Sequence, residues 1–314
     1  MGKPITSKSN ALLALHIAVF IWGFTAILGK LISYNSFTLV WHRMLITALV
    51  YLLIPSVWRQ LKGLPLKTMK IFLGIGLIVC AHWLTFYGSI KLGNSVSITL
   101  ACLGSATFFA AIIEPIAMKT PFSKQHILLG LVVMLGILLI YLSLPQSKVQ
   151  GVSNGLAILT GLLSALLAAS FTILNKQHIN KAPALAISTL EMISGAVLLT
   201  AILPFIAEKP CYFWPTIDIH LLHLNTLSSG EWDGIWVIIL ALVCTNLTFY
   251  LGTYSLQYLS AFTCNLTVNL EPIYGIILGA LIFHENKSLN PYFYLGAGII
   301  VLAIFAQAWL SRKG

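Results

Sequence analysis

Apolar stretches, each close to the length of one membrane-crossing helix, recur ten times along the 314 residues of the chain. A helix rises about 1.5 Å per residue, so about 20 apolar residues cover the roughly 30 Å of hydrocarbon in a bilayer. None of the stretches has the alternating pattern of an outer-membrane barrel strand. The sequence therefore predicts an all-α integral membrane protein with ten transmembrane helices. They run approximately over 10–31, 36–58, 68–90, 95–118, 123–143, 153–175, 184–205, 233–257, 260–284 and 290–311.

The composition of the chain agrees with a lipid environment. Hydrophobic residues make up 58% of the sequence and charged residues only 8%, with a mean hydropathy of +0.93. This leaves too little polar surface to cover a water-soluble globule of this size. The first apolar stretch follows Lys3 and Lys8, is too long for a signal-peptide core and has no clear small-residue cleavage site after it. We therefore predict that it is retained as the first span.

The basic residues are distributed unevenly between the two sets of connections. Because Lys and Arg in short loops tend to stay cytoplasmic, we predict both termini inside a cell (inner or plasma) membrane, with residues near Gln146 and Asp218 outside. The net charge of +10 is thus mainly a topology signal, and the basic residues do not form the aromatic-interleaved patch that indicates nucleic-acid binding. With this orientation the lysines outside are Lys30, Lys91, Lys148, Lys209 and Lys287.

One connection, over about 206–232, is much longer than the others and carries Trp214 and Trp232 among its aromatic residues. Aromatic side chains gather at the level of the lipid headgroups, which favours an interfacial segment. A lid over the outward opening is the alternative interpretation.

The sequence lacks the common motifs for catalysis, nucleotide binding and metal binding. It has no GxxxxGK[ST] phosphate loop, HExxH zinc helix or GxSxG nucleophile elbow. Its five cysteines have no CxxC spacing, and four lie within predicted spans, so we interpret them as packing residues. We therefore expect no enzyme, no cofactor, no metal site and no direct use of ATP. The alternative is a membrane-embedded enzyme that acts on a lipid or polyprenyl substrate through intramembrane His and Glu residues.

A weak internal repeat divides the chain into two halves. A shift of 166 residues lays Ser89 on Ser255 and Gly130 on Gly296, and a shift of 146 lays 27–30 on 173–176. The order of these matches predicts an N-terminal half over 1–147 and a C-terminal half over 148–314, each with five spans. An odd number of spans places the two copies in opposite membrane orientations, which is the geometry of alternating access around a shared site.

Several short motifs stand out along the chain. They are Phe20-Ile21-Trp22-Gly23-Phe24 followed by Lys30, then Arg43, Asn269-Leu270-Glu271-Pro272, His284-Glu285-Asn286 and Gly296-Ala297-Gly298. With these motifs the chain resembles the EamA-type permeases of the drug/metabolite transporter superfamily, over nearly its whole length. The resemblance implies ten spans in two halves and a secondary carrier or exporter of amino acids, metabolites or drug-like compounds. The fourth span departs from the family pattern, because Ser105-Ala106 stands where the repeat would place Glu-Pro.

Charged residues within the spans are the first candidates for solute binding, because a charge at mid-membrane costs at least about 2.5 kcal/mol. Glu271 is either a cavity carboxylate for a substrate amine or a proton, or a packing element at a kink made by Pro272. Arg43 either holds a substrate carboxylate or pairs internally. We interpret Glu191 as a snorkelling or helix-pairing residue and Glu114 as an interfacially solvated one.

Uncharged polar and aromatic residues complete the predicted substrate-binding set. Intramembrane His and Asn line polar cavities or bond to neighbouring helices, and aromatic rings form cavity walls or simply pack. Protons are a candidate coupling ion, and the lipid bilayer and a small solute are the expected partners. The complete predicted set is Trp22, Arg43, His82, Asn246, Tyr250, Asn269 and Glu271.

Overall fold

The computed structural model describes residues 5–144, 153–206, 230, 232–259, 264, 267–287 and 289–310, and within them it contains helices and no strands. Most of the long 206–232 connection, including position 218, lies outside the described residues, as do Gln146, Cys211 and Asn265. In chain order the helices are α1 (Ile5–Leu31), α2 (Ser36–Leu52), α3 (Pro55–Lys62), α4 (Leu66–Gly93), α5 (Val96–Leu103), α6 (Ala106–Met118), α7 (Lys124–Ser143), α8 (Asn154–His178), η1 (Ile179–Lys181), α9 (Ala184–Ile206), α10 (Asp233–Ala241), η5 (Leu242–Leu247), α11 (Thr248–Tyr258), α13 (Glu271–Phe283), η6 (Glu285–Lys287) and α14 (Pro291–Leu310).

Seven helical segments within the described residues are long and apolar enough to cross a membrane, and a bent pair, α2 with α3, makes up to eight. The pair bends by 88°, so the predicted stretch 36–58 is not one straight helix. Its break has a local cause. Pro55 starts α3 and disfavours helical backbone in the residue before it, and Ile54 is accordingly extended, with φ −84° and ψ 114°. The remaining apolar helices, Glu271–Phe283 and Pro291–Ala303, are shorter.

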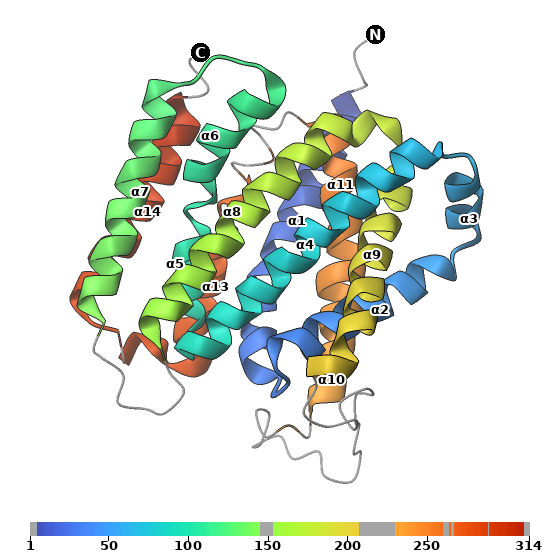
Figure 1. Ribbon diagram of the computed structural model, residues 1–314. Coiled ribbons are helices and arrows are strands. Elements are labelled where there is room, and N and C mark those ends of the chain that lie inside the picture. Colours follow the sequence, from blue (N-terminus) through green and yellow to red (C-terminus); the bar gives the residue numbers. More distant parts are fainter. Residues whose placement is uncertain are drawn as a thin grey trace.

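The helices form a bundle in which segments far apart in the sequence lie side by side (Figure 1). Helix α7 packs against α14 at one edge, α4 crosses α8, and α2 packs against α9 at the opposite edge. Helix α1 lies between these edges, in contact with α11 and α13. The interior of the bundle therefore contains helices from both halves of the chain.

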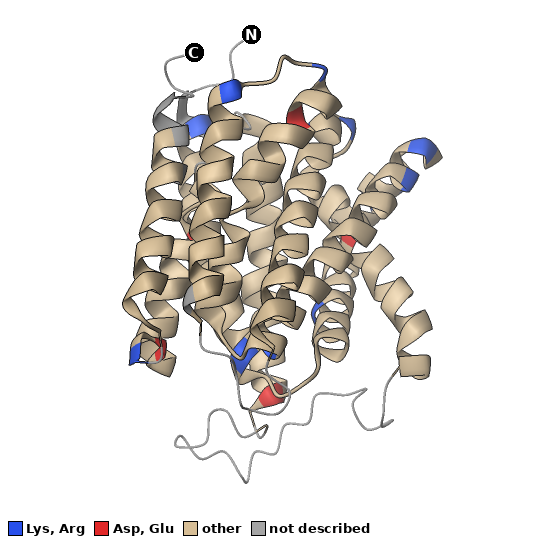
Figure 2. Ribbon diagram, turned by 60° about the vertical axis from the view of Figure 1, so that its left-hand side comes forward, with Lys and Arg blue, Asp and Glu red and all other residues tan. Residues whose placement is uncertain are grey.

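The outer surface of the bundle is apolar and its charges lie mostly at its ends. Phe205, Leu302 and Leu142 are each at least 70% exposed, which is costly in water and favourable in lipid. Figure 2 shows that Lys, Arg, Asp and Glu gather at the two ends of the bundle, with few between them. This distribution is that of a multi-pass membrane protein.

Two helical interruptions shape the interior. Helices α5 and α6 are separated at Gly104 and Ser105, and helix α13 begins directly at Glu271. Pro272 thus occupies the first turn of α13, where the missing N–H of proline would have no intrahelical partner in any case. The predicted mid-helix kink at Pro272 is therefore wrong, because the proline begins a helix instead of bending one.

Candidate functional site

A cavity of about 690 Å³ occupies the centre of the bundle. Its walls come from α1, α2, α4, α6, α8, α11 and α13, so both halves of the chain contribute to it. Thr120 and Pro121, in the connection between α6 and α7, line the cavity and are exposed. The cavity therefore reaches the surface at this end, which we call the open end. A volume of this size suits a small organic molecule.

Arg43 lies at the inner part of the cavity and is only 3% exposed. Its Nε donates to the Thr245 hydroxyl at 2.6 Å, one terminal N–H group donates to the Tyr87 hydroxyl at 2.7 Å, and the other to the Cys244 carbonyl at 3.4 Å. The guanidinium also stacks on Trp83, 3.7 Å from the ring centroid. Three of the five donors of the guanidinium are thus engaged within the protein, and its positive charge is fixed at the cavity wall.

A π-helical turn, η5, creates the acceptors that hold Arg43. Such a turn shifts the backbone hydrogen bonds from i−4 to i−5 and releases carbonyl groups to other donors. The Ala241 carbonyl accepts from Thr47 at 3.1 Å, and the Asn246 carbonyl accepts from Tyr51 at 2.5 Å. Helix α2 therefore satisfies the released carbonyl groups of η5 with three polar side chains, of which Arg43 is one.

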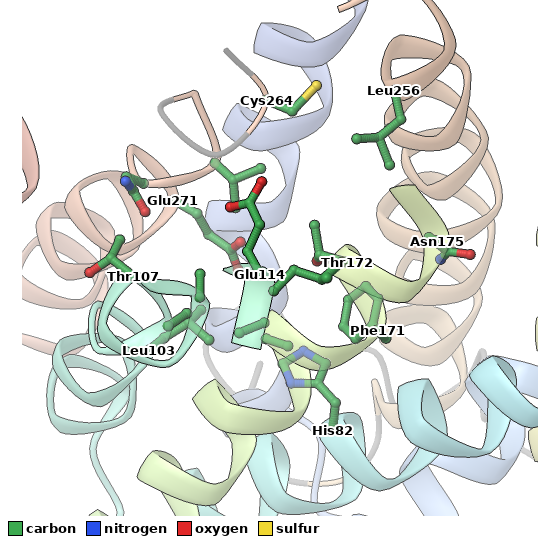
Figure 3. A pocket seen from close by; sticks show the side chains of 18 of the residues that line it. His82, Leu103, Thr107, Glu114, Phe171, Thr172, Asn175, Leu256, Cys264 and Glu271 are labelled. Atoms are coloured by element: carbon green, nitrogen blue, oxygen red, sulfur yellow. The ribbon is translucent and has the colours of Figure 1, made fainter. Parts of the chain in front are cut away.

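Two carboxyl groups, Glu271 and Glu114, point into the cavity from α13 and α6 (Figure 3). Glu271 starts its helix, where the positive end of the helix dipole favours a negative side chain. Sequence reasoning placed Glu114 at the membrane boundary and left it out of the predicted set. Its location on a helix that lines the cavity could be recognised only from the packing.

His82 holds a fixed orientation at the cavity wall. Its Nδ1 lies 2.9 Å from the carbonyl oxygen of Ser164, and because a carbonyl can only accept, Nδ1 is the donor. In the neutral imidazole, Nε2 is then the acceptor. The ring packs against Phe86 and Phe171, with centroids 6.0 and 5.4 Å away. His82 therefore presents an oriented acceptor beside aromatic walls.

Trp22 reaches the cavity from α1 because α11 has a glycine opposite it. A Cβ atom at Gly252 would lie 2.9 Å from the Trp22 ring, closer than a side chain tolerates. Gly275 plays a similar part for α13, since a Cβ there would lie 2.2 Å from Leu100 and 3.2 Å from the Gly23 carbonyl. These glycines allow the close helix packing that brings Trp22 and α13 to the cavity.

The structure brings together five of the seven predicted residues. Trp22, Arg43, His82, Asn269 and Glu271 line the cavity. The other two do not line it. Asn246 donates to the backbone of Thr47 at 3.4 Å, and Tyr250 packs against the main hydrophobic core with its ring 6.3 Å from that of Tyr254. Cavity residues that the sequence did not single out include Thr107, Glu114, His126 and Asn175.

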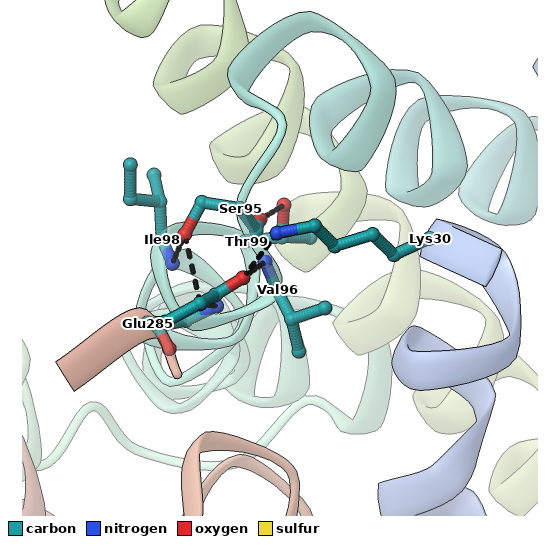
Figure 4. A network of polar contacts seen from close by, with 7 residues as sticks. Lys30, Ser95, Val96, Ile98, Thr99 and Glu285 are labelled. Atoms are coloured by element: carbon teal, nitrogen blue, oxygen red, sulfur yellow. Dashed lines mark hydrogen bonds and ion pairs between the residues drawn. The ribbon is translucent and has the colours of Figure 1, made fainter. Parts of the chain in front are cut away.

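A polar network joins α1, α5 and the connection between α13 and α14 at the end of the bundle opposite to the open end, which we call the closed end (Figure 4). Lys30, at the end of α1, forms an ion pair with Glu285 at 2.8 Å, and Glu285 is only 5% exposed. The Glu285 carboxylate also accepts from the Val96 and Ser97 backbone N–H groups at 3.0 Å and from the Ser95 hydroxyl at 3.1 Å. It therefore caps the first turn of α5 and joins it to α1.

Electrostatics favour the ionised form of Glu285, which lies between α13 and α14. Burial by itself raises the pKa of this carboxyl, but hydrogen bonds from Lys30 and Ser97 outweigh it, and the net pKa is below the usual value of 4.5. The carboxylate is thus charged at neutral pH.

A second set of contacts strengthens the closed end. Asp233 begins α10 and accepts from the Ser33 backbone N–H at 2.9 Å and from the Ser33 hydroxyl. Lys91, at the end of α4, donates to the Ile32 carbonyl. The short connection after α1 is therefore held by α4 and α10 together.

The described residues contain no group of three or more His, Cys, Asp or Glu side chains that could hold a metal ion. Four cysteines, Cys80, Cys102, Cys244 and Cys264, are free and buried, in keeping with packing positions. The polar side chains that line the cavity include Arg43, Thr107, Asn269 and Glu271.

An apolar helical bundle around a solute-sized internal cavity defines a polytopic membrane protein with its binding space inside the bundle. The chain belongs to the EamA-like transporter family, whose profile matches it twice, over residues 9–142 and 155–307. No curated protein matches the sequence. One crystal structure of a protein aligns over 97% of this chain and 98% of its own, with a TM-score of 0.63 and 15% identity, and this likeness shows the fold alone.

Proposed function

We propose that this protein is a secondary transporter that moves a small metabolite, amino acid or drug-like compound by alternating access through the central cavity. The observation that carries the proposal is the cavity itself, with Arg43 and Glu271 on its walls, an opening at one end and a polar closure at the other. By resemblance to the family, the direction is export, and protons are the candidate coupling ion. No observation favours an enzyme that acts on lipids.

The transporter architecture that we propose has ten spans in two inverted halves, 1–147 and 148–314. The two segments that match the family support this division. The helix breaks support it as well, because a shift of 166 residues lays Ser105, just before α6, on Glu271, the first residue of α13. Interrupted helices at equivalent positions of two repeats surround the substrate in many transporters.

The orientation that we propose puts both termini in the cytoplasm, so the open end of the cavity faces inward. The described lysines support a charge asymmetry. Lys30, Lys91 and Lys287 belong to connections at the closed end, whereas Lys119 and Lys124 flank the exposed α6–α7 connection at the open end. A cysteine placed at position 218 is expected to react with an impermeant reagent in intact cells. Labelling only after the membrane is made permeable would reverse the orientation.

Each cavity residue has a proposed role in solute binding. Glu271 supplies a negative charge for an amine, Arg43 supplies a fixed positive field, and Trp22 forms an aromatic wall. His82 presents the acceptor nitrogen described above. Asn269 lies next to the start of α13 and supplies a neutral hydrogen-bonding group.

Reconstitution in liposomes tests the proposed function directly. The wild-type protein is expected to accumulate or exchange at least one compound from a panel of radiolabelled amino acids and metabolites. Glu271→Gln keeps the size of the side chain and removes its charge, so affinity for that compound should fall about tenfold or more, since a hydrogen bond to a charged group contributes about 1.5–3 kcal/mol. Lys124→Gln, an exposed position at the start of α7, is the matched control and should transport normally.

Two further outcomes would contradict parts of the proposal. Normal transport by Glu271→Gln together with misfolding of Glu271→Ala would assign Glu271 a packing role. Failure of every compound to be transported by folded wild-type protein would remove the transporter proposal.

A further inference from the structure

Glu191, near the middle of α9, is a buried carboxyl group that the central cavity does not include. Its side chain is 0% exposed, and within the described part of the chain neither of its carboxyl oxygens has a hydrogen-bond partner. Glu191 thus does not snorkel to the membrane surface, and of the two interpretations from the sequence the helix-pairing one agrees with the Asn175 side chain of α8 beside its carboxyl. An intramembrane carboxyl group in this state is expensive to keep and points to a functional role.

Close helix packing encloses Glu191. A Cβ atom at Gly76 on α4 would lie 2.5 Å from the Glu191 Cα and 2.4 Å from its carbonyl oxygen, so the two backbones are in direct contact. One turn before Glu191, Ser188 bonds to the Thr253 hydroxyl of α11 at 3.3 Å. Glycine at position 76 therefore allows α4 to pack directly against the backbone of α9 at Glu191.

Asn175, on α8, connects Glu191 with the central cavity. Its side chain lies beside the Glu191 carboxyl, and it is one of the residues that line the cavity (Figure 3). Asn175 is 3% exposed, and its amide oxygen also lacks a hydrogen-bond donor among the described residues. Two neighbouring helices thus present three buried acceptor oxygens, and the amide NH2 of Asn175 is the neutral donor beside the Glu191 carboxyl.

The groups around Glu191 supply no compensating positive charge. Helix α2 contributes the Tyr51 hydroxyl, which is engaged by the Asn246 carbonyl, and α4 carries the buried thiol of Cys80. Helices α8 and α11 contribute the neutral groups of Asn175 and Thr253, and the basic side chains of α3, Arg59 and Lys62, are exposed. Among the described residues no cationic side chain pairs with Glu191.

The amide N–H of Asn175 can serve one Glu191 oxygen, but the Asn175 amide oxygen and the second carboxyl oxygen then still lack a donor, and the smallest donor is a proton. Calcium and magnesium each take six or more ligands, which is more than this place offers. We propose that Glu191, reached from the central cavity through Asn175, is a proton-binding site of the transport cycle and is separate from the solute site at Glu271. The role of Glu191 in a transport cycle rests on the proposed function, whereas proton binding by Glu191 can be measured without a solute.

Protonation of Glu191 starts from a hydronium ion in the cavity water. One O–H bond of the hydronium ion breaks and an O–H bond forms on one Glu191 carboxyl oxygen, which leaves a water molecule and a neutral carboxyl group. That O–H can donate to the amide oxygen of Asn175 while the Asn175 amide N–H donates to the other carboxyl oxygen, so both groups are paired. The reverse transfer requires water to reach Glu191, and therefore a movement of α8 or α9.

Infrared spectroscopy of the full chain in lipid bilayers tests the site. The carbonyl stretch of a protonated carboxylic acid is recorded during a pH titration with no solute added. We expect one such band at neutral pH to disappear in Glu191→Gln and to remain in Glu271→Gln and Glu285→Gln, the matched carboxamide controls. A folded Glu191→Gln protein with an unchanged spectrum would overturn the proposal.

A second variant keeps the test valid if Glu191→Gln does not fold. Asn175→Ala removes the acceptor for the acid O–H, so the band should move to higher frequency, and an unmoved band would also overturn the proposal. Loss of the band on adding sodium chloride, but not choline chloride, would assign the site to a metal cation instead of a proton. If the wild-type protein shows the band but transports no compound, the proton site stands and the transporter proposal fails.

Discussion

The two ends of the central cavity differ in how they are held. At the closed end, Lys30 and Glu285 join segments that are 255 residues apart in the sequence, and the carboxylate also caps α5. At the open end, the exposed α6–α7 connection lines the cavity, and the start of α7 is held by a local cap from Ser123, whose hydroxyl accepts from the His126 N–H at 3.3 Å. The closed end thus has an ion pair and a carboxylate cap, whereas at the open end the charged Lys176 of α8 donates to the neutral carbonyl oxygens of Leu256 and Leu259, at 3.1 and 3.0 Å.

For the transporter that we propose, this difference means that the charged contacts at the closed end must break before that end can open. A closure made of a few charged hydrogen bonds is strong when all its members are in place and weak once one is lost. A closure made of packed apolar side chains would instead lose its stabilisation gradually, because each of its many van der Waals contacts contributes little. The following four predictions change one contact at a time and compare the two ends, in order of decreasing effect.

Glu285→Gln is expected to cause the largest change. It removes the charge that compensates Lys30, which lies 4.7 Å from the Phe283 ring centroid and is only 18% exposed. Breaking a buried pair costs about 3 kcal/mol, so the thermal unfolding midpoint in detergent should fall by several degrees. A reporter cysteine at Ile98 should also become reactive from the closed end. Equal reactivity with and without the substitution would show that the network does not close the cavity.

Lys30→Met is expected to cost less, about 1–2 kcal/mol, because the Glu285 carboxylate keeps its hydrogen bonds to the first turn of α5. A double-mutant cycle with Glu285→Met measures the coupling between the two side chains, which should be about 1–3 kcal/mol. The double variant should remain less stable than the wild type, since methionine cannot cap α5. Additive effects would mean that the ion pair contributes nothing beyond its separate groups.

Acid should weaken the closed end. The pKa of Glu285 is lowered on folding, so its contribution to stability is full above the unfolded-state pKa of 4.5 and is lost as the pH falls through the lower folded value. Unfolding followed by tryptophan fluorescence should show a loss of stability on going from about pH 6 to about pH 3. Glu285→Gln should lose less over the same range, and an identical slope in both proteins would contradict the assignment.

Replacement of the two capping serines compares the two ends most directly, and Ser123→Ala should have the smallest effect on stability of all these changes. Ser95→Ala at the closed end removes a cap of α5 and a hydrogen bond to Glu285, at a cost of about 1–2 kcal/mol. Ser123→Ala at the open end removes only the local cap of α7, at a cost of about 0.5–1 kcal/mol. Chemical unfolding of both variants under the same conditions checks the order, and a larger effect at Ser123 would reverse our view of the two ends.

Membrane character and family were readable from the sequence because both depend on local or linear features. Bilayer thickness sets the length of each apolar stretch, and the family match follows residue order. Charges in apolar stretches also drew attention to Arg43 and Glu271, which line the cavity, since burying a charge in lipid is expensive. These conclusions require no knowledge of which helices are neighbours.

The partners of the individual polar side chains could not be predicted from the sequence, because they depend on which helices become neighbours in the bundle. Asn246 has the same polar character as Asn269, yet η5 turns it toward α2 and away from the cavity. Glu285 looks like a loop residue in the sequence and becomes the centre of the closed end only when α1 and α5 reach it. Glu191 is enclosed only because Gly76 lets α4 touch α9. Residue type thus determined what each side chain can do, and tertiary packing determined which partner it meets.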